Sequence, residues 1–85
     1  MRKQVFVDRL NSRRAISYRY TSVNLAGLVN IWFHKNHFVL SWEECKDGDQ
    51  WNEDNYTRDQ LYNFVDVNAV VKFLEGAEIA SEFFA

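Results

Sequence analysis

The chain has 85 residues, a formal net charge of −2, 47% hydrophobic residues and 16% aromatic residues. The length allows one compact unit that buries only about 60% of its unfolded surface, and the apolar fraction excludes an intrinsically disordered chain. The single cysteine, Cys45, excludes an internal disulfide and is typical of a reducing compartment.

No stretch of the sequence has the pattern of a targeting or membrane segment. Arg2 and Lys3 are not followed by the long apolar run of a signal peptide, and no apolar stretch approaches the length of a membrane span. We therefore expect a soluble, cytoplasmic protein in which residues 1–85 form a single small α+β domain.

The N-terminal segment, residues 4–10, has the composition of a strand. Val5, Phe6 and Val7 are β-branched or aromatic, and such residues are enriched in strands. A short helix over the same residues is the alternative, because periodicity does not separate the two in so short a run. As a strand, this segment is predicted to pair with the next one so that Val7 lies opposite Tyr18.

The next strand is predicted over residues 15–22, where apolar and polar side chains alternate. Residues 24–27 follow with Asn in the first position and Gly in the last, a composition that type I turns prefer. A turn there predicts a hairpin in which Tyr20 lies opposite Ile31.

The strongest pattern is residues 28–42, which read as two strands folded about Lys35 and Asn36. Pairing Phe33 with Phe38 in antiparallel geometry makes one face of this hairpin wholly apolar. A register shifted by one residue would mix polar and apolar side chains on both faces, so the pattern favours this pairing. The predicted pairs are Phe33 with Phe38, Ile31 with Leu40, and Val29 with Trp42.

Residues 43–59 are polar, acidic and without periodicity, which predicts a long surface loop. Loops of this length are uncommon in small domains and are often functional. We expect Trp51 and Tyr56 to hold the loop against the body of the protein.

The C-terminal part predicts a short strand and a helix. Residues 61–65 favour a strand, while Thr57 with Gln60 resembles a capping box that would start a helix earlier. Asp66 is the predicted N-cap of a helix over residues 67–75 with one apolar face.

These elements predict an α+β fold: an antiparallel β-meander of three to four strands, with one more short strand as an option, and a C-terminal helix packed on one face. Gly76 either ends that helix or interrupts it, with residues 77–85 continuing as helix.

No catalytic, nucleotide-binding or metal-binding signature stands out in the sequence. His34 and His37 are expected to face each other across the turn, with Cys45 or Glu43 as conceivable further ligands, but zinc requires four well-placed ligands. The acids around Cys45 disfavour the thiolate that a nucleophile needs. We expect a protein that is not an enzyme and that uses no cofactor or metal; a metal-dependent enzyme around His34, His37 and Cys45 is the weakest alternative.

The two halves of the chain carry opposite charge. Residues 1–42 contain seven basic side chains against one acid, and residues 43–85 contain three against eleven. The charges either neutralise one another within the fold, as in most small proteins, or form a basic and an acidic surface that steer different partners.

The acidic stretch supports our first functional hypothesis, a protein-binding regulator or inhibitor that occupies the basic surface of a partner. The small size and the lack of an active-site signature point to the compact phage or mobile-element proteins that block host machinery. The predicted partner-binding residues are Asp47, Asp49, Trp51, Glu53, Asp54 and Tyr56.

The alternative hypothesis is a module that binds single-stranded nucleic acid on the outer face of the sheet. In the predicted registers Phe6, Arg19 and Trp32 form one transverse row, and aromatic residues interleaved with Arg can stack bases. The negative net charge disfavours this reading because the acidic half repels phosphate. The C-terminal segment or a second copy of the chain, giving a homodimer, are the other candidates to cover this face.

Overall fold

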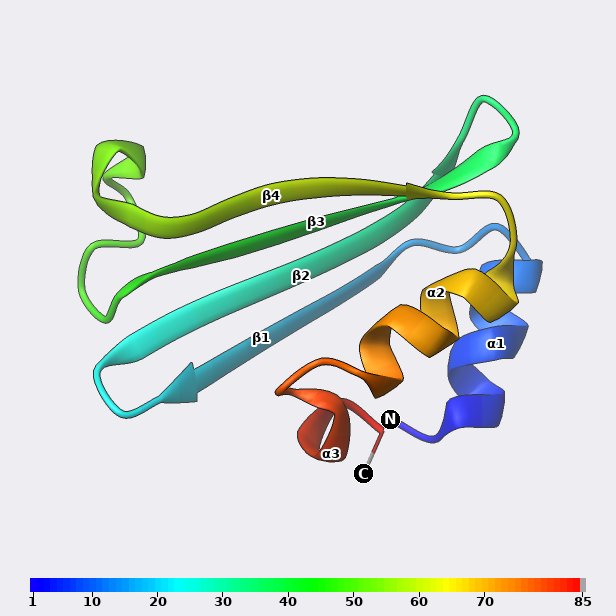
Figure 1. The fold of residues 1–85 in the computed structure, drawn as a ribbon, viewed down its shortest axis with the longest axis horizontal. Helices are drawn as coiled ribbons and strands as arrows, with labels where there is room; N and C mark the ends of the chain where they lie inside the picture. The colour runs from blue at the N-terminus through cyan, green and yellow to red at the C-terminus, as the bar shows by residue number, and fades with distance from the viewer. Residues whose placement is uncertain (85) are drawn as a thin grey trace.

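The computed structural model describes residues 1–84, without the side chain of Glu82, and has the predicted α+β architecture. The four strands form one antiparallel sheet in the order β1-β2-β3-β4, and all three α-helices lie on the same side of it (Figure 1). The elements are α1 (Lys3–Asn11), β1 (Ile16–Ser22), β2 (Leu25–His34), β3 (His37–Lys46), the 3-10 helix η1 (Glu53–Asn55), β4 (Tyr56–Phe64), α2 (Val67–Glu75) and α3 (Ala80–Phe83).

The central hairpin has the predicted register. Phe33 lies opposite Phe38, and the pairing continues along β2 and β3 to the far end of both strands. Lys35 and Asn36 form the two-residue turn with positive φ angles of 49° and 67°, as the turns that match the twist of a hairpin require. The apolar face of this hairpin forms the centre of the core, with Val29, Ile31 and Leu40 almost fully buried.

Helix α2 covers this apolar face, as predicted. The Asp66 carboxylate accepts a hydrogen bond from the backbone N–H of Ala69 at 2.8 Å, so Asp66 is the N-cap. Val70 and Leu74 lie one helical turn apart and are fully buried. Gly76 ends the helix, and α3 follows as a separate short helix rather than as its continuation.

The strand predicted at the N-terminus is wrong, because residues 3–11 form helix α1. Phe6 and Leu10, four residues apart, share one face of this helix, and each side chain is at most 1% exposed. Phe6 packs edge-on against Phe83, with ring centroids 5.4 Å apart. This contact joins residues 77 positions apart in the sequence and stabilises the helix. A local sequence pattern cannot reveal it.

The predicted register between the first two strands is also wrong. The turn lies at Val23 and Asn24, and Tyr20 lies opposite Gly27 instead of Ile31. Asn24 has a φ of 61°, so it provides the left-handed turn residue. Gly27 is needed inside β2, because a Cβ atom there would lie 2.1 Å from Cζ of Tyr20.

The predicted loop over residues 43–59 is shorter than expected. β3 continues to Lys46 and β4 begins at Tyr56, so the segment outside the sheet is residues 47–55, and it includes η1. The predicted strand at residues 61–65 is the second half of β4. No helix of residues 1–84 is both long enough and apolar enough to cross a membrane.

Candidate interaction surfaces

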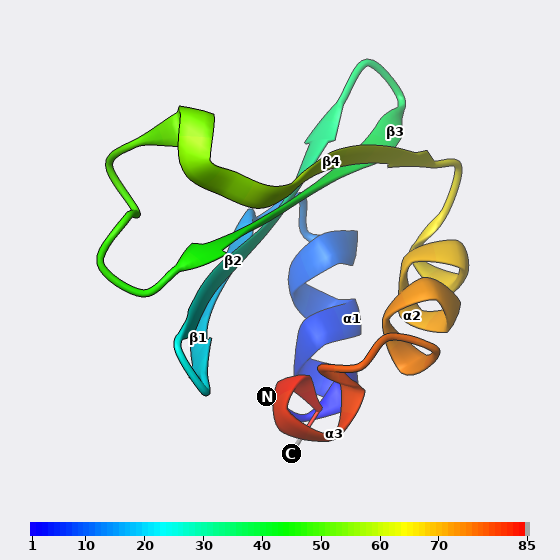
Figure 2. The ribbon, with the colours of Figure 1, turned by 60° about the vertical axis from the view of Figure 1, so that its left-hand side comes forward.

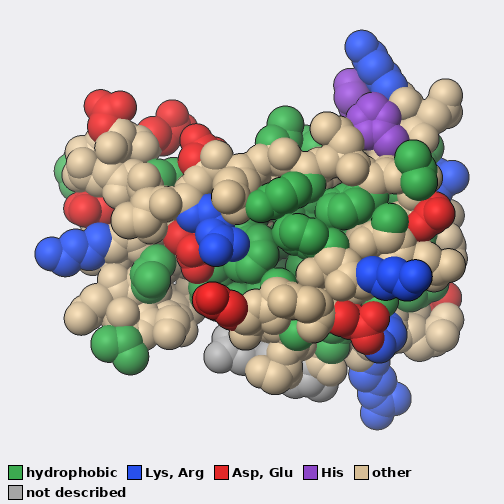
Figure 3. All heavy atoms as spheres, in the orientation of Figure 1, with side chains coloured by type: hydrophobic (Ala, Val, Ile, Leu, Met, Phe, Trp, Pro, Cys, Tyr) green, Lys and Arg blue, Asp and Glu red, His purple; other side chains and the backbone are tan. Residues whose placement is uncertain are grey.

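The sheet extends beyond the helices, and residues 43–59 form the projecting end together with the β1–β2 turn (Figures 1 and 2). We call residues 43–59 the acidic arm. It consists of the last part of β3, the connecting segment and the first part of β4. Acidic side chains gather over this end of the molecule in Figure 3.

The connecting segment of the arm is shaped by its own hydrogen bonds. Gly48 N donates to Gln50 Oε1 at 2.7 Å, and Gln50 Nε2 donates to Asp47 Oδ1 at 3.1 Å. Trp51 Nε1 donates to Gly48 O at 3.0 Å, and the Tyr56 hydroxyl donates to Gln50 O. Gly48 has a φ of 104°, a backbone conformation that residues other than Gly rarely adopt.

The two aromatic residues of the arm have different roles. Tyr56 is half-buried and holds the segment, as expected, and burial together with the acids Glu43 and Glu53 raises the pKa of its hydroxyl, which stays protonated and donates. Trp51 does not hold the segment against the body, because its side chain is 86% exposed. The indole is instead exposed to solvent, and its N–H donates to Gly48 O.

The acids of the arm are largely uncompensated. Glu43 lies directly opposite Asp59 in the β3–β4 register, and like charges in this position repel. Between the side chains that the structure describes there are two ion pairs, Lys3–Glu75 at 2.5 Å and Arg58–Glu44 at 3.0 Å. Of these two, the first joins the basic and acidic halves of the chain, so direct pairing neutralises little of the charge of either half among the described residues.

Where the arm joins the rest of the sheet, the inner face carries a polar network that sequence reasoning missed. The Tyr20 hydroxyl donates to Glu44 Oε2 and accepts from Trp42 Nε1 at 2.8 Å. The Arg58 guanidinium pairs with Glu44 and lies 4.0 Å from the centroid of the Trp42 ring. Alternation along β3 would have placed Glu44 on the inner face, had the strand been extended past residue 42.

A groove borders this network between β4 and α2. Its volume is about 390 Å³, and its walls include Arg58, Tyr62 and Phe73. The Tyr62 and Phe73 rings are 4.6 Å apart, and hydrophobic side chains are exposed on this face of the molecule in Figure 3.

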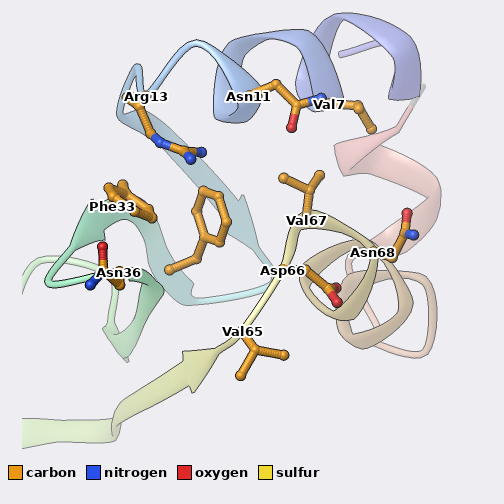
Figure 4. A pocket seen from close by; sticks show the side chains of 10 residues that line it. Val7, Asn11, Arg13, Phe33, Asn36, Val65, Asp66, Val67 and Asn68 are labelled. Atoms are coloured by element: carbon orange, nitrogen blue, oxygen red, sulfur yellow. The ribbon is translucent and has the colours of Figure 1, made fainter.

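A second cleft, of about 530 Å³, lies at the other end of the sheet, between α1, the turn at residues 34–37 and the start of α2 (Figure 4). The guanidinium of Arg13 lies 4.0 Å from the centroid of the Phe33 ring. The side chains of Asn11 and Asn68 offer hydrogen bonds to a polar group, but the carboxylate of Asp66 also lines the cleft. The cleft therefore has no clear charge preference.

The predicted row of Phe6, Arg19 and Trp32 does not exist. Phe6 belongs to α1 and is fully buried on the helix side of the sheet. Arg19 lies opposite Leu28, and Trp32 lies four residues further along β2, opposite Val39 on β3. The error follows from the wrong N-terminal strand and from the shifted β1–β2 register.

The histidines and the cysteine are not brought together. His34 lies opposite His37 at one end of β3, as expected, whereas Cys45 is buried near the other end of that strand. Burial and the nearby acids Asp49 and Asp47 raise the pKa of the Cys45 thiol. Within residues 1–84, excluding the side chain of Glu82, no group of three or more His, Cys, Asp or Glu side chains could hold a metal ion.

The fold and these surfaces define an α+β protein with one antiparallel sheet, a helical layer on one face and a projecting acidic arm. Comparisons with protein-family models, with curated proteins and with solved structures found no match to this chain.

Proposed function

We propose that the protein is a non-catalytic regulator or inhibitor that binds another protein, and that the acidic arm docks on a basic surface of that partner. The observation that carries the proposal is the composition and exposure of the arm: its connecting segment carries acids that belong to no ion pair of the described residues, together with an indole that is 86% exposed. Proteins of this kind are common in phages and mobile elements, and the free thiol of Cys45 suits the reducing cytoplasm.

The charges of the arm favour a basic partner for two reasons. A basic surface would relieve the repulsion between Glu43 and Asp59, which lie opposite each other. Clustered acids also attract a cationic surface over about 8–10 Å at physiological ionic strength and thereby accelerate association.

The shape of the arm favours a protein as the partner. The hydrogen bonds within the arm, from side chains and from the backbone, hold the segment in one conformation before binding, which lowers the entropy cost of association. Trp51 in this segment is exposed, and Trp is among the residues that most often dominate the energetics of protein interfaces.

The nucleic-acid alternative has lost the row of residues on which it rested, because Phe6 is buried and Arg19 and Trp32 lie apart. The acidic arm adds to the electrostatic penalty for binding phosphate.

The proposal is tested by quantitative capture of a partner from a cell extract, with identification by mass spectrometry. We expect the triple variant Asp49→Asn, Glu53→Gln, Asp54→Asn to capture the same partner at least about tenfold more weakly. The variant Trp51→Ala should cause a similar loss. Capture by the wild type should decrease as the salt concentration rises.

A matched control separates the arm from net charge. The triple variant Asp8→Asn, Glu75→Gln, Glu78→Gln removes the same number of negative charges from exposed positions outside the arm, and we expect it to capture the partner like the wild type. Equal losses in both triple variants, unchanged capture by the arm variants, or no specific capture at low ionic strength would contradict the proposal.

A further inference from the structure

The helices lie on one side of the sheet, and much of the opposite, outer face is open (Figure 2). At one end of this outer face, Gln50 and Tyr56 of the arm line a cleft together with Arg19 and Glu43. The C-terminal segment does not reach the outer face: the ring of Phe83 packs under the sheet, 4.8 Å from the ring of Tyr18 and 5.4 Å from that of Phe6. Leu61 on this face is 64% exposed, and Trp32 is partly exposed. The part of the face outside this cleft is therefore available to an external partner.

One transverse row of the outer face carries an unbalanced set of charges. From β1 to β4 the row reads Arg19, Leu28, Glu43, Asp59. Glu43 and Asp59 face each other directly, and Arg19 stands at the opposite edge of the sheet. With strands about 4.8 Å apart, Arg19 is roughly 14 Å from the β4 strand, so it is too distant to neutralise Asp59 within the same sheet. None of these three charged side chains belongs to an ion pair of the described residues.

We propose that the outer face is the interface of a homodimer, in which two sheets stack face to face about a twofold axis parallel to the strands. This rotation places β1 of one copy over β4 of the other and keeps each transverse row at its own level. Arg19 of each copy then lies over Asp59 and next to Glu43 of the other copy. Each repulsive acidic pair gains a cation, and each unpaired Arg gains two carboxylates.

The neighbouring rows are also complementary to themselves under the same rotation. Asn30 lies opposite Ser41 in the sheet, so the rotation brings the amide of one copy over the hydroxyl of the other. Trp32 lies opposite Val39, so the rotation brings each indole over the Val39 side chain of the other copy. A twofold interface requires this kind of self-complementary patch.

The size of the face sets the expected strength of the dimer. Four strands at about 4.8 Å spacing and about seven residues of 3.3 Å rise bury roughly 1,000 Å² in total from two copies. This value lies near the lower limit of specific interfaces. We therefore expect a dimer that dissociates at micromolar concentrations.

The test is the mass of the protein in solution, measured by sedimentation equilibrium from about 1 μM to about 1 mM. The wild type should change from a 10.1 kDa monomer to a dimer over this range. Arg19→Asp and Asp59→Arg should each weaken self-association by about tenfold or more, because both place like charges in contact. The double variant Arg19→Asp, Asp59→Arg should restore the dimer, because the charges are exchanged.

The control is Arg14→Asp, which reverses an exposed charge outside the sheet and should leave the mass profile unchanged. Far-UV circular dichroism of each variant verifies the fold. A wild type that stays monomeric to about 1 mM, single variants that dimerise like the wild type, or a double variant that remains monomeric would overturn the proposal. The wild-type measurement decides even if a variant does not fold.

This inference shares Glu43 and Asp59 with the acidic arm of the proposed function, but other residues of the arm separate the two tests. Asp49, Glu53 and Asp54 are outside the paired strands that form the interface, so neutralising them should weaken partner capture and leave dimer formation intact.

Discussion

Tyr20 joins three strands on the inner face of the sheet. Its hydroxyl bridges Trp42 and Glu44, and its ring lies across Gly27, the residue opposite it. Glu44 in turn pairs with Arg58. Of the buried polar side-chain atoms described, none is without a hydrogen bond, and a buried network is stable only when its members are satisfied in this way.

The pKa of Tyr20 is raised, first by burial and then by its hydrogen bond to Glu44. Because the pKa is higher in the folded than in the unfolded state, the unfolded chain loses this proton first. The stabilisation is complete below the ordinary pKa of about 10 and is lost as the pH rises from there toward the folded pKa. We expect the free energy of unfolding of the wild type to fall in this alkaline range.

Tyr20→Phe should remove this alkaline dependence, while costing about 1–3 kcal/mol at neutral pH because Glu44 and Trp42 each lose a partner. Urea unfolding of both proteins at several pH values between about 8 and 11 measures the difference. Cys45 and Tyr56 also have raised pKa values, but both are present in both proteins. Equal alkaline slopes would show that Tyr20 does not contribute.

Gly27→Ala should destabilise the fold, because the new Cβ atom would lie 2.1 Å from Cζ of the Tyr20 ring. The ring must move and lose its two hydrogen bonds, so we expect a loss of about 2–4 kcal/mol. Chemical denaturation measures it. Gly76→Ala is the control: the nearest atoms to its Cβ lie at 3.8 Å, so stability should change by less than about 1 kcal/mol. Similar values for both variants would contradict the close contact.

The two long helices end and begin by different means. α1 has no side-chain cap at its N-terminus, and at its C-terminus Arg14 N bonds to Arg9 O and Arg13 N to Leu10 O. This is the Schellman arrangement, which usually has Gly where Arg13 stands with a φ of 61°. α1 therefore depends on burial of Phe6 and Leu10, whereas α2 has a local start signal of its own.

Asp66→Ala should destabilise the protein by about 1 kcal/mol, because the N–H of Ala69 loses its acceptor at the start of α2. Asp66→Asn should retain most of the stability, since Asn is an equally good N-cap. Thermal and urea unfolding measure both, with Glu78→Ala as an exposed control outside the helix. An Ala variant as stable as the wild type would show that the cap contributes nothing.

At the scale of the whole molecule, the two ends of the chain close the layer under the sheet. The Met1 amino group donates to Phe83 O at 2.9 Å, and the Phe6 ring contacts those of Phe83 and Phe84. The helices are thereby held on one face. The acidic arm and the part of the outer face that the arm does not cover remain open, which is why the two proposals concern these surfaces.

The parts of the structure that depend on neighbours in sequence could be predicted. The β2–β3 register follows from the alternation of apolar and polar side chains on both sides of Lys35 and Asn36. Once Phe33 is paired with Phe38, every other pair along the two strands is fixed. The start of α2 follows from Asp66 and the apolar spacing after it. The acidic character of the arm follows from the composition of residues 43–59 and could be predicted without knowledge of the fold.

Contacts between distant segments decided the rest. Phe6 is helical because Phe83 and the sheet bury it, and Gly27 lies in a strand rather than a turn because Tyr20 crosses it. The row of Arg19, Glu43 and Asp59 exists only in the observed registers of three strand pairs. Local pattern determined the central hairpin and α2, because turn geometry and side-chain periodicity act over a few residues. Tertiary packing alone decided the N-terminal helix and which charges share a face, because the energy that selects them comes from side chains far apart in the chain.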